Sequence, residues 1–235
     1  MPIYNAQDHI ARCVESIRRQ TYQNLEILLL NDGSKDVSLE VCRMYAKVDP
    51  RIVLIDKANS GVAATRNMGL REAKGKYLQF VDADDTIQHA GVVIGFGGIA
   101  GHCFVLQPRG TTGYCHRIIC AQDYSAVTAA CMMVKRSAFE EVGGLTEELA
   151  VAFNDIDFCM KLRTAGYLIV YNPYAELYHY ESKSRGLEDT PEKVARFNKE
   201  IQVFERRWPD IMRDGDPYYN PNLTLKSQDF SLKRI

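Results

Sequence analysis

The feature that most constrains the fold is an alternation of short apolar runs with segments of helical periodicity over the first 81 residues. The apolar runs are short enough for buried strands and end at polar turns. They are Leu25–Leu30, Ile52–Ile55 and Tyr77–Val81. Apolar residues recur at helical spacing over Ile10–Ile17, Val37–Val48 and Gly61–Lys74. Strands that alternate with helices predict an α/β domain with a mixed, mostly parallel sheet flanked by helices, and ligands beyond the carboxyl ends of the strands.

The second half has a weaker pattern, because the chain after Asp85 is rich in glycine and only weakly periodic. We expect a buried strand at Ser125–Val134. The later elements are predicted to be a helix, two strands and a long helix, at Asn154–Thr164, Leu168–Tyr171, Leu177–Tyr178 and Pro191–Trp208. The last helix carries an apolar stripe of Val194, Phe197, Ile201, Phe204 and Trp208. We expect this stripe to cover the core; the alternative is that it lies on a membrane surface.

Four polar motifs stand just after predicted strands. They are Pro2-Ile3-Tyr4-Asn5, Asn31-Asp32-Gly33-Ser34, the segment from Asn59 to Gly69, and Asp82-Ala83-Asp84. A single Asp-x-Asp turn would be weak support for any function, since acidic turns are common, but four motifs in the expected order are specific. The ordered set resembles family 2 glycosyltransferases, and the resemblance covers nearly the whole chain. It implies the GT-A fold, the Rossmann-like fold of nucleotide-diphospho-sugar transferases.

The resemblance implies that residues 1–85 form the half that binds a nucleotide diphosphate sugar donor. Asp32 would meet a uracil-like base or the ribose, and Arg66 would reach the base or the phosphates. Lys183 and Arg185 suit the departing diphosphate, because cationic side chains neutralise phosphate oxygens. The predicted donor-binding residues are Pro2, Tyr4, Asn5, Asp32, Arg66, Asp82, Lys183 and Arg185.

A divalent cation, Mn²⁺ or Mg²⁺, is expected beside the diphosphate, because the leaving group carries the charge of two phosphates. Asp84 is the predicted carboxylate ligand, with Asp82 beside it or beside the ribose. The resemblance also implies that His179 can complete the metal shell, since imidazole ligates manganese. The ordinary alternatives are a solvated acidic turn for the two aspartates and a packed polar residue for the histidine.

Residues 86–190 are expected to form the acceptor side of the same domain, followed by a C-terminal helix and tail at 191–235. The run from Phe153 to Cys159 resembles the acceptor-side motif of the family, in which Asp155 matches the catalytic base. An inverting transfer needs a carboxylate that takes the proton from the attacking hydroxyl. Asp157 is the weaker candidate. Acidic residues in a first helical turn also interact well with the helix dipole, and Asn154 would then be an ordinary N-cap.

Two features depart from the family pattern. Only the residues up to Ile3 stand where several more apolar residues normally precede the first motif, so the first strand is expected to be truncated. Asp85 also runs directly into Thr86, where the family has a further helix and strand, which resembles a deletion or recombination between capsule-type and rhamnan-type polysaccharide enzymes. The alternative function is therefore a catalytically inactive sugar-nucleotide-binding or assembly module.

Charge and composition bear on the partners. The 29 basic and 30 acidic side chains give a net charge of −1, so nucleic acid is not expected as a partner. We expect a glycan or a lipid-linked glycan as acceptor. No apolar run reaches the length of a membrane span, which predicts a cytoplasmic protein; peripheral membrane contact and homo-oligomerisation remain open. The odd count of seven scattered cysteines favours free thiols.

One glycine-rich segment imitates a different function. Val92 to Gly101 resembles a dinucleotide-binding fingerprint, which requires a helix directly after the glycines. Pro108, Gly110 and Gly113 argue against such a helix. We therefore do not expect a dinucleotide site here.

Overall fold

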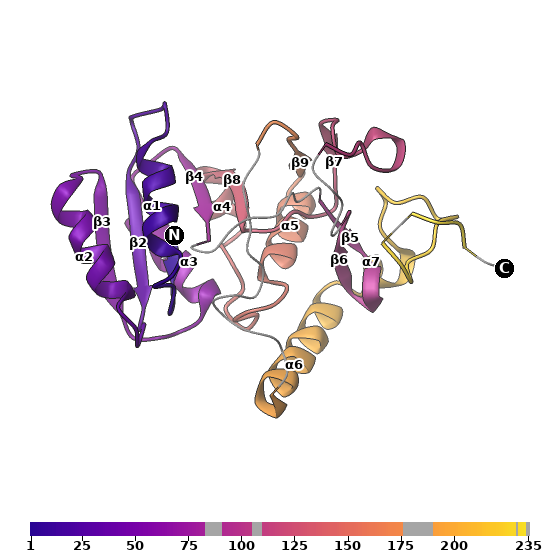
Figure 1. Cartoon of the computed structure of the whole chain (residues 1–235). Coiled ribbons are helices and arrows are strands. Elements are labelled where there is room, and N and C mark those ends of the chain that lie inside the picture. The colour runs from indigo at the N-terminus through magenta and orange to yellow at the C-terminus, as the bar shows by residue number, and fades with distance from the viewer. Residues whose placement is uncertain (83–90, 105–109, 176–189, 229, 234–235) are drawn as a thin grey trace. The chain divides into compact units, whose positions relative to one another are not determined.

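The computed structural model describes residues 1–82, 91–104, 110–175, 190–228 and 230–233 (Figure 1). The chain forms two compact units, each assembled from segments that are distant in sequence. Unit 1 comprises Met1–Ile87, Ala129–Val151 and Leu177–Asp189. Unit 2 comprises Gln88–Thr128, Ala152–Glu176 and Thr190–Ile235.

Unit 1 begins with three strands that form a parallel sheet in the order β1-β2-β3. The strands are β1 (Pro2–Ile3), β2 (Ile27–Asp32) and β3 (Ile52–Lys57). The helices that accompany them are α1 (Ile10–Arg18), α2 (Ser38–Val48) and α3 (Val62–Glu72). The predicted alternation of helices and strands is confirmed. β2 extends further than expected, so that Asn31 and Asp32 lie in the strand and not in the turn after it.

The remaining strands of unit 1 run antiparallel. β4 (Tyr77–Val81) pairs with β8 (Cys131–Lys135), with Val81 opposite Cys131, and α4 (Arg136–Glu141) follows β8. The strand predicted at Ser125–Val134 is therefore confirmed only at its end. Residues 125–130 are mostly buried without forming a strand, because burial alone produces the same apolar pattern as a strand does. Together the two sheets give unit 1 a mixed architecture.

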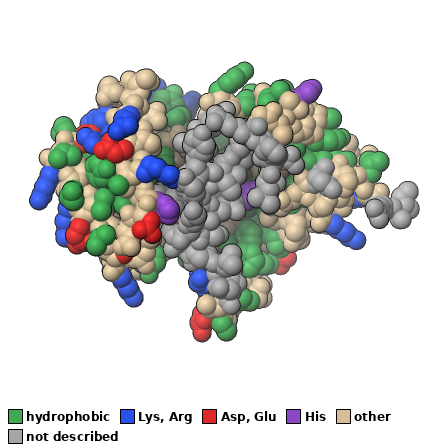
Figure 2. All heavy atoms as spheres, viewed as in Figure 1, with side chains coloured by type: hydrophobic (Ala, Val, Ile, Leu, Met, Phe, Trp, Pro, Cys, Tyr) green, Lys and Arg blue, Asp and Glu red, His purple; other side chains and the backbone are tan. Residues whose placement is uncertain are grey.

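The core of unit 1 lies between the parallel sheet and the helices α1 and α2. It contains Ile3, Ile10, Val14, Leu29, Cys42 and Ile52. Of the apolar residues whose spacing predicted α2, Val41 packs against the core, whereas Val37, Met44 and Val48 are exposed. α2 turns Ser38 inward, where its hydroxyl accepts the Ala6 N–H at 2.8 Å. Figure 2 shows apolar, acidic and basic side chains mixed over the region of α1 and α2.

Unit 2 contains three helices and four short strands among the described residues. The helices are α5 (Asn154–Thr164), α6 (Pro191–Arg207) and α7 (Pro209–Asp214). The strands are β5 (Val92–Ile94), β6 (Ala100–His102), β7 (Gln122–Asp123) and β9 (Val170–Tyr171). β5 pairs with β6 and β7 with β9, both antiparallel. The predicted helix α5 is confirmed, whereas the strand predicted at 168–171 is limited to β9.

The glycine-rich segment forms a hairpin and not a nucleotide-binding turn. Between β5 and β6 the chain makes a 3₁₀ turn, η1 (Phe96–Gly98), and no helix opens there. Gly95 and Gly98 adopt positive φ values of 104° and 98°, a conformation that is unfavourable for residues with a side chain. A second 3₁₀ turn, η2 (Tyr114–His116), follows later. At these described residues the chain therefore lacks the helix that a dinucleotide fingerprint requires directly after its glycines.

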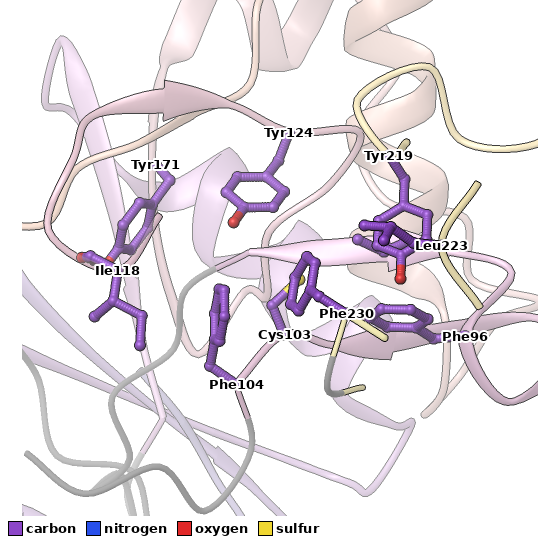
Figure 3. Packing of buried hydrophobic residues seen from close by; sticks show 10 residues of the cluster. Phe96, Cys103, Phe104, Ile118, Tyr124, Tyr171, Tyr219, Leu223 and Phe230 are labelled. Atoms are coloured by element: carbon purple, nitrogen blue, oxygen red, sulfur yellow. Dashed lines mark hydrogen bonds between the residues drawn. The ribbon is translucent and has the colours of Figure 1, made fainter. Parts of the chain in front are cut away.

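The core of unit 2 is rich in aromatic side chains, and the C-terminal segment supplies part of it (Figure 3). Phe230 stacks on Phe104 with ring centroids 4.7 Å apart, and Tyr219 meets the Phe96 ring edge-on at 5.1 Å. Leu223 is also buried in this cluster. The residues after α6 are therefore a structural part of unit 2 and not an appended tail.

The long helix α6 buries a narrower face than the sequence predicted. Its buried residues are Glu200, Val203 and Phe204, whereas Val194, at the start of the expected stripe, is 42% exposed. Thr190 caps the helix, and its side chain accepts the Lys193 N–H at 3.4 Å. Within the described part of the chain, no helix combines the length and the apolar character that crossing a membrane requires.

Candidate active site

The loops after β1 and β2 are joined by hydrogen bonds. Asn5 has a φ of 50°, a left-handed conformation that asparagine tolerates better than most residues. Its backbone N–H donates to Ser34 Oγ at 3.1 Å, and its Oδ1 accepts the Lys35 N–H at 2.8 Å. The side chain of Tyr4, next to it, is 41% exposed. The first two motifs thus meet at neighbouring carboxyl ends of the parallel sheet, as the strand order requires.

Asp32 ends β2 as a buried carboxylate with several donors. Its Oδ1 accepts the Ser60 N–H at 2.9 Å, and its Oδ2 accepts the Gly61 N–H at 3.1 Å. Gly61 precedes the first residue of α3, where a negative charge is favoured by the helix dipole. Lys57 Nζ also donates to Asp32. The carboxylate is held in one orientation as a hydrogen-bond acceptor.

Lys57 is a member of this site that the sequence patterns did not single out. Besides Asp32, its ammonium group donates to Ser60 Oγ at 2.6 Å and to Thr65 Oγ1 at 3.1 Å. Its side chain is only 12% exposed, so its ammonium group is largely shielded from water and has Asp32 as its charged partner. The only available signal was its place at the end of β3, in line with Asp32 on the neighbouring strand.

Arg66 and Asp82 form an ion pair between α3 and the residue after β4. Arg66 Nη2 donates to both carboxylate oxygens of Asp82, at 2.8 and 3.1 Å. The Arg66 side chain is 5% exposed and that of Asp82 is 24% exposed, and the guanidinium lies 5.8 Å from the centre of the Phe80 ring. The structure thus brings together two of the predicted donor-binding side chains.

This pairing bears on the expected metal site. Both oxygens of Asp82 are engaged by Arg66, so the carboxylate fits the task of orienting that guanidinium better than the task of a principal metal ligand. Asp84 and His179, the other predicted ligands, lie outside the described residues, as do Lys183 and Arg185. Among the residues that the structure does describe, no group of three or more His, Cys, Asp or Glu side chains is placed to hold a metal ion.

In unit 2, Asp155 and Asp157 share the first turn of α5 but differ in surroundings. Asp155 is half-buried, and its Oδ2 accepts the Thr128 hydroxyl at 3.1 Å. Asp157 is fully buried, and its Oδ1 accepts Arg207 Nε at 2.7 Å and Trp208 Nε1 at 2.9 Å. Asp157 therefore serves as an anchor inside the protein, whereas Asp155 keeps partial exposure.

The expectation that Asn154 is an N-cap is wrong, and two contacts of Asp157 were not predicted. Asn154 is the first residue of α5, and the N-cap position is taken by Phe153 with a φ of 61°. Lys161 Nζ lies 3.5 Å from Asp157 Oδ2, on the next turn of the helix. Burial lowers the pKa of Lys161, and the neighbouring Asp157 carboxylate opposes this shift. Trp208 had been assigned to an apolar stripe, which gave no sign that its indole N–H would bind a carboxylate.

Comparison with known proteins agrees with this architecture. Over 86% of this chain and 62% of the other, the structure superimposes on the mannosyltransferase PcManGT from Pyrobaculum calidifontis, solved with GDP-Man and Mn²⁺, with a TM-score of 0.59 and 20% sequence identity. At that identity the likeness establishes the fold, which is GT-A. Residues 1–92 match the model of glycosyl transferase family 2. This part of the chain, which holds Asp32, Arg66 and Asp82, is the part that is similar to that family.

Two relatives match nearly the whole chain. The uncharacterised protein y4gI of Sinorhizobium fredii is 42% identical over 269 residues, and the O-antigen biosynthesis protein RfbC of Myxococcus xanthus is 29% identical over 271. The alignments cover 98% and 100% of this chain but only 30% and 21% of the relatives. Since 269 exceeds the 235 residues here by 34, y4gI has at least that many aligned positions without a counterpart in this chain.

Proposed function

We propose that this chain is a metal-dependent, inverting glycosyltransferase that moves a sugar from a nucleotide diphosphate sugar to a hydroxyl of a glycan acceptor in surface polysaccharide synthesis. The observation that carries the proposal is the set of paired ionic side chains at the strand ends of unit 1. Asp32 is fixed by Lys57, and Arg66 is fixed by Asp82, within the segment that matches the family. The name of RfbC and the ligands of the mannosyltransferase structure support the substrate class.

The donor is proposed to bind across these side chains, together with Pro2, Tyr4 and Asn5. A manganese or magnesium ion would be held by Asp84, with Asp82 and His179 beside it. When bound, it would supply positive charge to the diphosphate, a task that Lys183 and Arg185 would share.

In the transfer step, an oxygen–carbon bond forms between the acceptor hydroxyl and the anomeric carbon. The bond from that carbon to the diphosphate oxygen breaks, and its electron pair leaves with the diphosphate. The hydroxyl proton passes to the carboxylate of Asp155. The half-buried position of Asp155 suits this task better than the buried, fully engaged position of Asp157.

The test is nucleotide release from UDP- and GDP-sugars in the presence of Mn²⁺ or Mg²⁺, with glycan acceptors. Asp84→Ala and Asp155→Asn are expected to lower turnover by at least about 100-fold, as loss of a metal ligand or general base does. Asp210→Ala is the matched control, because Asp210 is an exposed aspartate in α7. Equal release by wild type and Asp84→Ala with every donor would contradict the proposal.

The alternative is a catalytically inactive module that binds sugar nucleotides. The observation that favours it is that the alignments with y4gI and RfbC are longer than this chain. This agrees with residues that are present in both relatives and missing from this chain. Binding of UDP or GDP that requires Mn²⁺, with no release from any donor, would support this alternative and exclude the enzyme.

A further inference from the structure

Residues of α6 and its C-cap residue Trp208 contact the chain on both sides of Asp155 in the first turn of α5, although α5 starts at Asn154 and α6 only at Pro191. We propose that α6 is a positioning element for Asp155, with Trp208, Arg207 and Glu200 as positioning residues that hold the carboxylate where it can take a proton from the acceptor. The inference rests on the proposed function and extends it to a part of the chain for which the apolar stripe predicted only a packing role. Three separate contacts carry it.

The first contact lies on the N-terminal side of the turn. The backbone N–H of Ala152 donates to Glu200 Oε2 at 2.9 Å. Glu200 is only 2% exposed, and a carboxylate is costly to bury unless it is hydrogen-bonded. A glutamate inside the buried face of an amphipathic helix is unexpected for packing alone. This bond to the chain just before α5 accounts for its place there, and Arg196, whose Nε lies 3.9 Å from Oε2, supplies a charged partner on the same helix.

The second contact is at the N-cap residue itself. Phe153 adopts a left-handed conformation that bulky residues rarely take, and it does so directly before the helix that carries Asp155. Its ring packs against two rings of α6, with centroids 5.4 Å from Phe197 and 5.7 Å from Phe204. The unusual backbone angle is therefore held in place by the packing of this side chain on α6.

The third contact lies on the C-terminal side. Asp157 receives the Arg207 and Trp208 donors at 2.7 and 2.9 Å, both from the end of α6. Asp157 lies two residues after Asp155, and Phe153 lies two residues before Asp155. The backbone of Asp155 is therefore fixed on either side. Thr128 holds the carboxylate from another segment of the same unit. General bases act only within hydrogen-bond reach of the proton they take, so such fixing acts on the chemical step.

The experiment compares Trp208→Phe with Tyr219→Phe in the full chain. The first variant removes a donor to Asp157; the second removes a hydroxyl that donates to Thr224 O at 2.8 Å elsewhere in unit 2. We expect Trp208→Phe to lower kcat by on the order of 10-fold while KM for the donor stays within about twofold, since orientation and not binding is lost. Tyr219→Phe is expected to leave kcat within about twofold. Glu200→Gln, which keeps an acceptor for the Ala152 N–H, should be less impaired than Glu200→Ala.

Hydrogen–deuterium exchange of the amides of residues 154–158 gives a readout that does not depend on turnover. Exchange should be faster in Trp208→Phe than in wild type and unchanged in Tyr219→Phe. If wild type transfers sugar and Trp208→Phe retains full kcat, the inference is overturned and the proposed function stands. If wild type transfers nothing, the proposed function fails, and unchanged exchange in Trp208→Phe would overturn the inference separately.

Discussion

Asp32 in unit 1 and Asp157 in unit 2 are both buried carboxylates held by a cation and by N–H donors, but their partners come from different distances along the chain. Asp32 binds Lys57, Ser60 and Gly61, all within 29 residues. Asp157 accepts hydrogen bonds from Arg207 and Trp208, 50 and 51 residues away, and Lys161 on its own helix lies further off, at 3.5 Å. The proposed donor side therefore completes its own site within the segment that matches the family, whereas the proposed acceptor side depends on α6 and its C-cap residue.

The comparison predicts that damage to the Asp157 anchor is confined to unit 2. Asp157→Ala should lower the free energy of unfolding by about 3 kcal/mol, the low end for breaking a buried ion pair, because Arg207 is 35% exposed and can reach water. Trp208 is the only tryptophan, so its fluorescence during urea unfolding follows this site directly. Asp210→Ala, at an exposed pair, should change stability by less than about 0.5 kcal/mol. Equal urea midpoints for Asp157→Ala and Asp210→Ala would contradict the prediction that the buried Asp157 anchor contributes more to stability than the exposed Asp210 pair.

The converse prediction concerns Lys57. Lys57→Met should weaken binding of UDP or GDP about 10-fold, because the Asp32 carboxylate loses its charged partner and its fixed orientation. Isothermal titration calorimetry with either nucleotide and Mn²⁺ measures the effect, and Lys47→Met, at an exposed lysine of α2, is the control. Trp208→Phe should bind nucleotide like wild type. A loss of nucleotide affinity in Trp208→Phe equal to that in Lys57→Met would refute the independence of the two sides.

The difference between nearby and distant partners also explains how much of the structure could be predicted from the sequence. Local patterns were sufficient for β4 and α5, whose observed bounds coincide with the predicted ones, and for the placing of Asn5, Asp32 and Asp82 at strand ends. Local patterns failed where a side chain binds a partner that is distant in the sequence. Glu200 points inward because it binds the Ala152 N–H, and Trp208 is a donor and not merely an apolar residue. Periodicity indicates which positions face a core, but it does not indicate which polar group a side chain will bind in that core.

The smallest expected effect concerns the cysteines, none of which is in a disulfide. Buried cysteines are distributed over both units, so their labelling compares the two units directly. Burial raises the pKa of Cys42 in unit 1 to about 11 and that of Cys159 in α5 to about 12, which keeps both thiols protonated and poorly reactive at neutral pH. Iodoacetamide followed by mass spectrometry should label the exposed Cys115 and Cys120 first.

In Trp208→Phe, labelling of Cys159 should rise a few-fold, because looser anchoring of α5 lets its thiol open to solvent more often. Cys42 should stay as protected as in wild type, since the hydrogen bond that Trp208→Phe removes lies within unit 2. Equal acceleration at Cys42 and Cys159 would mean that the two units open together, and the dependence on α6 would then belong to the whole chain and not to the acceptor side alone.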